Sequence, residues 1–359
     1  MEKKFTPVFL LLISYFLLLT SFSFSQSSLQ FLSATTGAGC YEVCYYNNYL
    51  FAGVGNTLMV FDASTGVPPM NKLFEYRFSS NIDNIEVKGN KMFVAANHAG
   101  LSMWNISNPA LPVMLDEYVP DSLNEAAYNI AFFGDTVFLA YKTKMAFFKD
   151  NGNSLSLLGK FAYQSGTNTK VRGCAVKGNI LAFTVAYGTN PQTGVYIYNA
   201  STVTQLSFFQ QNYCDPEEVE FGKNTNLLHV AGGTESLASF GLDAKGLFYS
   251  LDISNPSFPV EVYRDSLPGF PGLAIAMPMN IVNRNDTLFV ATESAFDANY
   301  QNGDTISGHV YVYDATIAGN IYLINSLNAG LWHFDMDIID NKMFVASEWY
   351  GVKTVDISD

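Results

Sequence analysis

The chain has 359 residues, of which 15% are aromatic and 14% are charged, and its formal net charge is −13. So many aromatic side chains beside so few charges exclude a disordered chain, a collagen-like chain and a coiled coil, and they favour a globular protein rich in strands. The acidic balance repels a phosphate backbone, so we expect no nucleic-acid partner.

Residues 1–25 have the pattern of a signal peptide. Two lysines precede an uncharged apolar run over 5–24, and Ser23 and Ser25 occupy the small-residue positions of a cleavage site before Gln26. The run is also long enough to serve as an uncleaved membrane anchor. Because no second apolar run of that length follows, cleavage would leave a secreted or cell-surface protein with no membrane span.

The rest of the chain, 26–359, contains a short alternating segment that recurs seven times. One copy is LMVFD at 58–62 and another is VYVYD at 310–314. Successive copies lie about 40–60 residues apart, close to the period of a four-stranded propeller blade. The copies end at Asp62, Asn105, Lys149, Asn199, Asp252, Asp314 and Asp356, of which the copy that ends at Lys149 is degraded.

Each unit has the same order of expected strands. A strand with polar flanks, such as 85–87, leads through the turn Gly89-Asn90 into an apolar strand, such as 92–95. The recurring segment is the third strand, and a fourth, such as 112–115, ends the unit. Seven such units with no helical period predict an all-β fold, a single seven-bladed β-propeller with four antiparallel strands per blade. The expected blades are 37–78, 79–120, 121–164, 165–212, 213–266, 267–328 and 329–359.

The last unit differs from the others because it contains only three expected strands. A spare strand at 29–33 precedes the first unit. A ring needs its two ends joined, so we expect this N-terminal strand to close the last blade as its fourth strand. The alternative is that the ending has nothing to do with ring closure.

Three units share a longer motif. It reads GLSMWNISNPALP at 100–112, SLDISNPSFP at 250–259 and GVKTVDISD at 351–359. A strand that ends in Asp or Asn, followed by Ile-Ser and then Asn or Asp, resembles the LVIVD-repeat propellers of secreted bacterial proteins. The resemblance implies a propeller and a secreted or cell-surface location, and it implies no particular reaction.

We expect the polar residue that ends each recurring strand to be a turn residue and not a catalytic acid. Asp and Asn side chains in this position hydrogen-bond nearby backbone N–H groups. Pro109 and Pro256 then favour an extended entry into the fourth strand.

The segments that enter the innermost strands would form the mouth of the central channel. Acids that converge there could bind a cation or a cationic ligand, while the plainer interpretation is an ordinary polar lining filled with water. The candidate ligand-binding residues are Tyr41, Glu42, Asp83, Tyr128, Arg172, Glu217, Glu218, Trp332, His333 and Asp335, with Asn84, Asn129 and Asp337 beside them.

Histidines offer one route to catalysis. His333 lies beside acids at the expected mouth, and a pair with Asp335 could serve acid–base chemistry, although a structural hydrogen-bonded pair is commoner. His229 and His309 lie inside apolar strands, where we expect packing roles. Cys174 and Cys214 lie in neighbouring units and could form a disulfide in an exported protein, or remain buried thiols.

Two units carry insertions, at 232–246 and 293–308, which could widen a binding surface. The second has alternating oxygen-bearing side chains that suggest calcium. Its spacing departs from that of an EF-hand loop, so an exposed polar loop is the plainer alternative. The candidate calcium ligands are Asp297, Asn299, Asn302 and Asp304.

Large aromatic residues recur at equivalent strand positions, where we expect them to fill the space between blades. They are Phe61, Trp104, Phe148, Tyr198 and Tyr313. The sequence therefore predicts an exported, non-enzymatic propeller that binds an extracellular protein, peptide or glycan. The alternative is an extracellular enzyme with an acidic site at the channel mouth.

Overall fold

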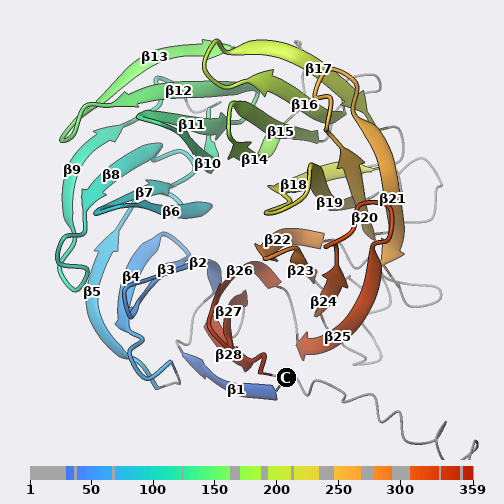
Figure 1. Ribbon diagram of the computed structural model, residues 1–359. Coiled ribbons are helices and arrows are strands. Elements are labelled where there is room, and N and C mark those ends of the chain that lie inside the picture. Colours follow the sequence, from blue (N-terminus) through green and yellow to red (C-terminus); the bar gives the residue numbers. More distant parts are fainter. Residues whose placement is uncertain are drawn as a thin grey trace, which may run out of the picture.

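The computed structural model describes residues 30–35, 39–66, 69–122, 125–161, 170–186, 193–211, 214–233, 246–267, 278–292, 308–330, 333–347 and 351–358. The signal peptide predicted at 1–25 lies outside these residues. All regular elements within them are strands, which form seven four-stranded antiparallel sheets arranged as a ring around a central channel (Figure 1). The predicted all-β, seven-bladed propeller is confirmed. Within the same residues there is no helix of the length and apolarity that crossing a membrane requires.

The first four blades are formed by consecutive strands, innermost strand first. The first blade consists of β2 (Cys40–Tyr46), β3 (Tyr49–Val54), β4 (Thr57–Asp62) and β5 (Asn71–Arg77). The second consists of β6 (Asn84–Lys88), β7 (Lys91–Ala95), β8 (Leu101–Asn105) and β9 (Val113–Tyr118). The third consists of β10 (Ala127–Phe133), β11 (Thr136–Tyr141), β12 (Lys144–Asp150) and β13 (Leu155–Phe161). The fourth consists of β14 (Lys170–Lys177), β15 (Ile180–Ala186), β16 (Gly194–Asn199) and β17 (Thr204–Gln210).

The remaining blades follow the same order. The fifth consists of β18 (Asp215–Phe221), β19 (Leu227–Gly233), β20 (Gly246–Asp252) and β21 (Val260–Leu267). The sixth consists of β22 (Pro278–Arg284), β23 (Thr287–Thr292), β24 (Gly308–Asp314) and β25 (Tyr322–Gly330). The seventh contains β26 (His333–Ile339), β27 (Lys342–Ser347) and β28 (Gly351–Asp356), and its sheet also includes β1 (Gln30–Thr35).

Strand β1 pairs antiparallel with β28, in a register that runs from Gln30 opposite Asp356 to Thr35 opposite Val352. This is the pairing that ring closure by the N-terminal strand would require. That β1 holds the ring closed in the folded protein stays a prediction.

Two-residue turns explain why the first two strands form a hairpin in six of the blades, while five residues separate β18 from β19 in the fifth. Asn47 and Asn48 have φ angles of 49° and 67°, and Asn285 and Asp286 have 53° and 65°. Two successive residues with positive φ form the turn whose twist matches that of the flanking strands, and Asn and Asp tolerate this conformation better than most residues.

The residue that ends the third strand acts as a turn residue in all seven blades. Its side-chain oxygen accepts a hydrogen bond from the backbone N–H two residues further on, at 2.8–3.0 Å. In the third blade the sequence pattern placed the equivalent residue at Lys149, which lies opposite Thr136 as Asp62 lies opposite Tyr49, but a lysine cannot make this turn. Strand β12 continues to Asp150, whose carboxylate makes the turn with Gly152.

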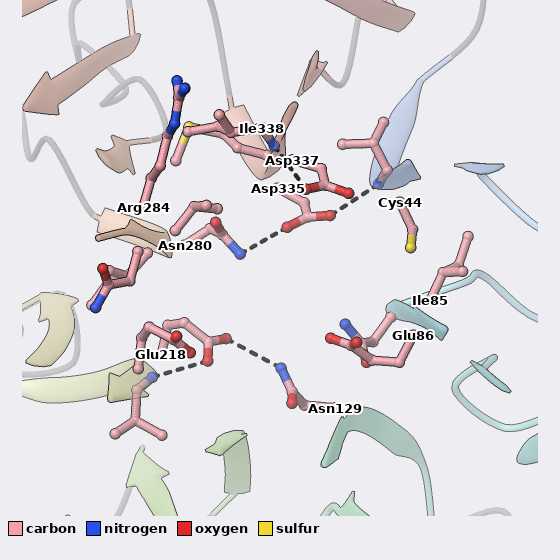
Figure 2. Close-up of a pocket in the computed structure, with 18 of the residues that line it drawn as sticks. Cys44, Ile85, Glu86, Asn129, Glu218, Asn280, Arg284, Asp335, Asp337 and Ile338 are labelled. Carbon is pink, nitrogen blue, oxygen red and sulfur yellow. Dashed lines mark hydrogen bonds between the residues drawn. The ribbon is translucent and has the colours of Figure 1, made fainter. Parts of the chain in front are cut away.

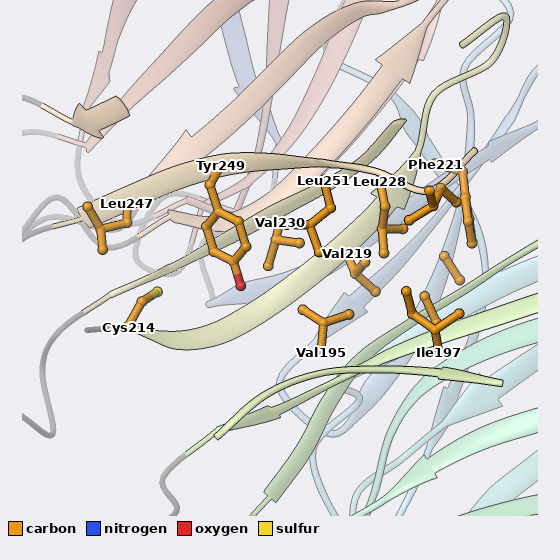
Figure 3. Packing of buried hydrophobic residues seen from close by; sticks show 13 residues of the cluster. Val195, Ile197, Cys214, Val219, Phe221, Leu228, Val230, Leu247, Tyr249 and Leu251 are labelled. Atoms are coloured by element: carbon orange, nitrogen blue, oxygen red, sulfur yellow. The ribbon is translucent and has the colours of Figure 1, made fainter. Parts of the chain in front are cut away.

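The core lies between the blades, in seven hydrophobic clusters that each join two neighbouring blades. Figure 3 shows one of them, in which Val195 and Ile197 of β16 face Val219 of β18 and Tyr249 of β20. The predicted aromatic positions are confirmed, because all five side chains are buried in these clusters: Phe61, Trp104, Phe148, Tyr198 and Tyr313.

The four cysteines are free thiols. Cys174 and Cys214 pack into different clusters, so the disulfide considered from their positions in neighbouring units is not formed. Burial raises the pKa of both thiols well above the ordinary value, which makes them packing residues and not reactive nucleophiles.

Candidate ligand site at the channel mouth

The channel is lined by the innermost strand of each blade: β2, β6, β10, β14, β18, β22 and β26. All of these except β6 carry an irregularity near their first residues, where the register against the second strand shifts. A bulge re-aims side chains and leaves one residue unpaired. This explains how consecutive residues, such as Tyr41 and Glu42, or Glu217 and Glu218, can line the same cavity.

The mouth cavity, at the start of these strands, has a volume of about 220 Å³ and receives residues from all seven blades. The structure brings seven of the ten predicted residues together there: Tyr41, Glu42, Asp83, Tyr128, Arg172, Glu217 and Glu218. Asp335 lines a deeper cavity instead. Trp332 and the side chain of His333 lie outside the part of the chain that the structure describes. That the mouth residues bind a ligand stays a prediction.

The sequence reasoning missed the contribution of the sixth blade, and Phe334 in the seventh. Met279, Asn280 and Phe334 also line the mouth. Asn280 lies opposite Ala291, as Asn84 lies opposite Ala95. Aligning the units on the alanine of the second strand would therefore have identified Asn280.

At the boundary between the mouth and the deeper cavity, one residue from each blade occupies the same level of the channel. Here it is called the polar ring, and it consists of Glu42, Asn84, Asn129, Gly173, Glu218, Asn280 and Asp335. All six ring residues other than Gly173 lie opposite Gly or Ala on the second strand, and these small neighbours leave room for the polar side chains.

The polar ring ties several neighbouring blades together. Asn84 Oδ1 accepts a hydrogen bond from the backbone N–H of Ile130 at 3.1 Å, and Asp335 Oδ2 accepts one from Val43 at 2.9 Å. Asn280 donates to the other oxygen of Asp335 at 2.7 Å. Both oxygens of Asp335 are thus used in joining blades, which supports a structural role for this residue over acid–base catalysis.

The fourth blade departs from this pattern because its ring residue is Gly173. A Cβ atom there would lie 2.7 Å from Glu218 Oε1 and 2.8 Å from Glu218 Cα, so no side chain fits without a shift. With no partner from Gly173, the backbone N–H of Val219 is bonded by the side chain of Glu218 at 2.9 Å. Asn129 holds the other oxygen of Glu218 at 3.2 Å.

The deeper cavity has a volume of about 510 Å³ and is rich in carboxyl groups (Figure 2). Burial raises the pKa of Glu86 to about 8, with further contributions from Asp335 and Asp337. Burial likewise raises the pKa of Glu220 to about 7, of Asp335 to about 7 and of Asp337 to about 6. These carboxyl groups therefore lose their protons at a higher pH than an exposed carboxyl group does.

An ion pair and an aromatic ring organise the mouth. Arg172 Nε lies 2.5 Å from Glu217 Oε2, and its guanidinium lies over the ring of Tyr128, 5.2 Å from the centroid. Burial raises the pKa of Asp83 to about 6, against the lowering effects of Asn97 and Arg172. Burial and the nearby Asp335 raise the pKa of Glu42 well above its usual range.

Four buried oxygen atoms of the mouth lining have no hydrogen-bond partner among the described residues: Glu42 Oε2, Asp83 Oδ2, Glu217 Oε1 and Asn280 Oδ1. Glu217 is 3% exposed and Glu42 is 9% exposed. A buried acceptor without a partner is costly, so four in one cavity indicate a place where a donor can bind.

In the part of the chain that the structure describes, no three Asp, Glu, His or Cys side chains are grouped so that they could hold a metal ion. The calcium candidates Asp297, Asn299, Asn302 and Asp304 lie outside the described residues. So does most of the other insertion, over 234–245.

Comparison with known proteins agrees with the architecture. The family model of the LVIVD repeat matches residues 81–119 and 243–264, which contain strands β6–β9 and β20. The chain carries LVIVD repeats on a seven-bladed propeller. A comparison of the sequence with curated proteins found no match.

Solved structures resemble this LVIVD-repeat propeller in fold. The computationally designed Ika8 protein matches with a TM-score of 0.58 and 14% identity, covering 91% of this chain and 99% of its own. A chain of the mitotic checkpoint complex matches with a TM-score of 0.67 and 11% identity, covering 92% of this chain and 91% of its own. At these identities the likeness concerns the fold alone, so function must be argued from the site.

Proposed function

We propose that this LVIVD-repeat propeller is a non-enzymatic binding module whose ligand enters at the channel mouth. The observation that supports it is the mouth cavity, which is lined from all seven blades and contains four buried oxygens without partners among the described residues. Concave sites with a few convergent polar groups and perturbed carboxyl groups are the usual place for a ligand.

Export is part of the proposal. The positively charged start, the apolar run over 5–24 and the small residues before Gln26 support a cleaved signal peptide. The ligand would then be a group of an extracellular protein, peptide or glycan. Mass spectrometry of protein recovered from the exporting cell should find a mature N-terminus at Gln26. A chain that retains residues 1–25 would contradict cleavage.

A mouth-blocking variant tests the binding site. Asn81 lines the cavity and is exposed, so Asn81→Trp should cover the mouth without disturbing the core. A matched control is Asn153→Trp, in the exposed turn between β12 and β13, the two outer strands of the third blade. Ligands are first found by thermal shift over metals, glycans and peptides. Asn81→Trp should then weaken binding at least tenfold, while Asn153→Trp should bind like the unaltered protein.

The two variants also show what would overturn the proposal. If a ligand binds Asn81→Trp as tightly as the unaltered protein, its site is elsewhere and the mouth is a polar lining only. An enzymatic role, the alternative considered from the sequence, has less support, because the Asp335 oxygens bond Val43 and Asn280 instead of facing the mouth. Turnover of a mouth ligand that is lost in Asn81→Trp would favour the enzyme over the binding module.

A further inference from the structure

The chemistry of the mouth oxygens restricts the kind of ligand. With the carboxyl groups ionised, Glu42 Oε2, Asp83 Oδ2, Glu217 Oε1 and Asn280 Oδ1 are all acceptors, and they come from four different blades. A ligand that satisfies these oxygens must therefore supply hydrogen-bond donors. Three of the four belong to carboxyl groups, so a donor that also carries positive charge would gain most from this position.

Each of the three carboxyl groups offers one oxygen and not two. Glu217 already binds Arg172 through Oε2, Asp83 is hydrogen-bonded by Asn97, and Glu42 interacts with Asp335. A guanidinium is recognised best by both oxygens of one carboxylate in a planar fork. A primary ammonium is a compact charge with three donors that can point to separate oxygens, which is the arrangement that these residues present.

Apolar side chains complete the cavity. Tyr41 and Phe334 form a wall of the mouth, with ring centroids 5.1 Å apart, and Met279 lies in the same lining. Such a surface suits the methylene stem of an alkylamine while the charged end reaches the oxygens. Tyr128 is less suited to hold the cation, because Arg172 already lies over its ring.

Other cations fit less well. A quaternary ammonium has no N–H group and would leave the four acceptors without donors. A metal ion needs several ligands grouped around one point, and no such group of Asp, Glu, His or Cys occurs among the described residues.

We propose that the channel mouth binds a primary ammonium group on a short alkyl stem, as in a lysine side chain or a small alkylamine. This inference rests on the proposed function of the mouth as a ligand site, and it adds the chemical class of the ligand.

Binding should be coupled to proton release. Asp83, with a pKa of about 6, and Glu42, with a raised pKa, hold protons that a neighbouring cation would displace. The titratable groups that act electrostatically on Asp83 are Arg172, His98 and Lys170. Those that act on Glu42 are Asp335, Asp83 and Glu218. Since Arg172 and Lys170 are cations that the ligand must approach, added salt should change the affinity as well.

Isothermal titration calorimetry of the purified protein tests the class of ligand. The probes are n-butylamine, N-acetyl-lysine methylamide, the trimethyl-lysine counterpart, N-acetyl-arginine methylamide and calcium chloride. The two primary amines should bind, the lysine probe more tightly if the natural source is a peptide, and the trimethyl counterpart should be at least tenfold weaker. Titrations at pH 6.5 in two buffers of different ionisation enthalpy should show proton release.

Variants assign the binding to the mouth. Asp83→Asn and Glu217→Gln should each lower the affinity for the lysine probe about tenfold. Glu117→Gln, on the exposed outer strand β9, should leave the affinity unchanged. Circular dichroism and the melting temperature establish that each variant is folded, and the comparison of probes on the unaltered protein does not depend on any variant.

Different failures have different meanings. If the trimethyl, arginine or calcium probe binds as tightly as the primary amines, or no amine binds at millimolar concentration, the ammonium proposal is wrong. The mouth remains a ligand site in that case if another ligand loses affinity in Asn81→Trp. If no ligand is affected by Asn81→Trp, the proposed function itself fails.

Discussion

The spaces between the blades and the channel at their centre are built from the same strands in opposite ways. Each inter-blade cluster is apolar, and its largest side chains, such as Trp104 and Phe148, are 2% exposed or less. The channel holds instead carboxyl groups, among them Glu86 and Asp337, whose pKa values burial raises. The clusters are apolar in every blade, whereas the polar ring of the channel contains Glu, Asn, Gly and Asp at its equivalent positions.

This contrast separates stability from function. Apolar burial stabilises the fold wherever the pattern repeats, and similar residues serve equally well in each blade. Buried carboxyl groups cost free energy unless they are paired or protonated, so their presence along one axis calls for another explanation. Binding is the explanation that the mouth geometry supports. Substitutions in the inter-blade clusters and in the channel test this contrast.

The largest effect should come from the inter-blade core. Trp104 is 2% exposed and packs edge-on against Tyr76, with ring centroids 4.9 Å apart. Trp104→Ala should lower the free energy of unfolding by about 3–5 kcal/mol, because it removes a large apolar side chain and leaves a cavity. Urea unfolding measures the change.

Two substitutions serve as controls for Trp104→Ala. Phe258→Ala, at a site 73% exposed, should change the free energy of unfolding by less than about 0.5 kcal/mol. Glu218→Gln in the polar ring should change it by less than about 1 kcal/mol, because it keeps the shape of the side chain and one acceptor. If Glu218→Gln cost as much as Trp104→Ala, the channel would have to be regarded as part of the stabilising core.

The next effect concerns the pairing of β1 with β28. Deleting residues 30–35 exposes the edge of β28 and removes the backbone hydrogen bonds between the two strands. At about 0.5–1.5 kcal/mol for each bond, the free energy of unfolding should fall by about 3 kcal/mol. Hydrogen exchange at residues 352–356 should become faster. Deleting 26–29 alone is the control, and an unchanged stability without 30–35 would show that β1 does not hold the ring closed.

The fold could be predicted from the sequence because its signals are local and repeated. Alternating strands, turns such as Gly89-Asn90 and the Asp or Asn that ends the third strand recur in unit after unit, and the structure shows each of them. The one exception is the degraded third copy, in which Lys149 has the expected register and the next residue, Asp150, makes the turn. There the third strand is one residue longer, which the pattern alone does not reveal.

The site could be predicted only in part. Residues on the entry segments were found because topology places them at the mouth, whatever their side chains do. Asn280 was missed because its unit is the longest, so simple spacing fails, whereas Phe334 was passed over between His333 and Asp335, which were both named. The pairing of Asp335 with Val43 joins residues 292 positions apart, and the pKa shifts depend on burial. Neither follows from residue order.

The pH dependence of stability should have an unusual direction. The raised pKa values of Glu86 and Glu220, about 8 and 7, mean that these groups are protonated in the folded protein where the unfolded chain has lost the proton. The folded state then binds more protons, so the free energy of unfolding should fall by about 2 kcal/mol between pH 5 and pH 8. Lys177 and Lys223, which lower the pKa of Glu220, limit the fall.

Urea unfolding at both pH values measures this change. Glu86→Gln keeps the side-chain shape and cannot ionise, so it should reduce the loss of stability between pH 5 and pH 8. Glu75→Gln, on the exposed strand β5, is the control and should leave the loss unchanged. A stability that rises from pH 5 to pH 8 would contradict the buried, protonated channel.

The smallest effect should come from a buried polar pair between the second and third strands of the fifth blade. His229 is fully buried, as its position in an apolar strand predicted, and its Nδ1 lies 2.8 Å from the Ser250 hydroxyl. Its Nε2 has no partner among the described residues, and burial lowers the pKa of His229 to about 3, so the ring is neutral. In five other blades the equivalent position is Phe: Phe51, Phe93, Phe138, Phe289 and Phe344.

Replacing both members of this pair should therefore stabilise the protein. His229→Phe with Ser250→Val reproduces the facing Phe51 and Val60 of the first blade and should raise the free energy of unfolding by about 1 kcal/mol, because no buried polar atom is left without a partner. His229→Phe alone should gain less, since the Ser250 hydroxyl then loses its partner. Urea unfolding of the two variants compares them. A double variant less stable than the unaltered protein would show that the polar pair stabilises the fifth blade. The interior of the blades would then differ less from the polar channel than the structure indicates.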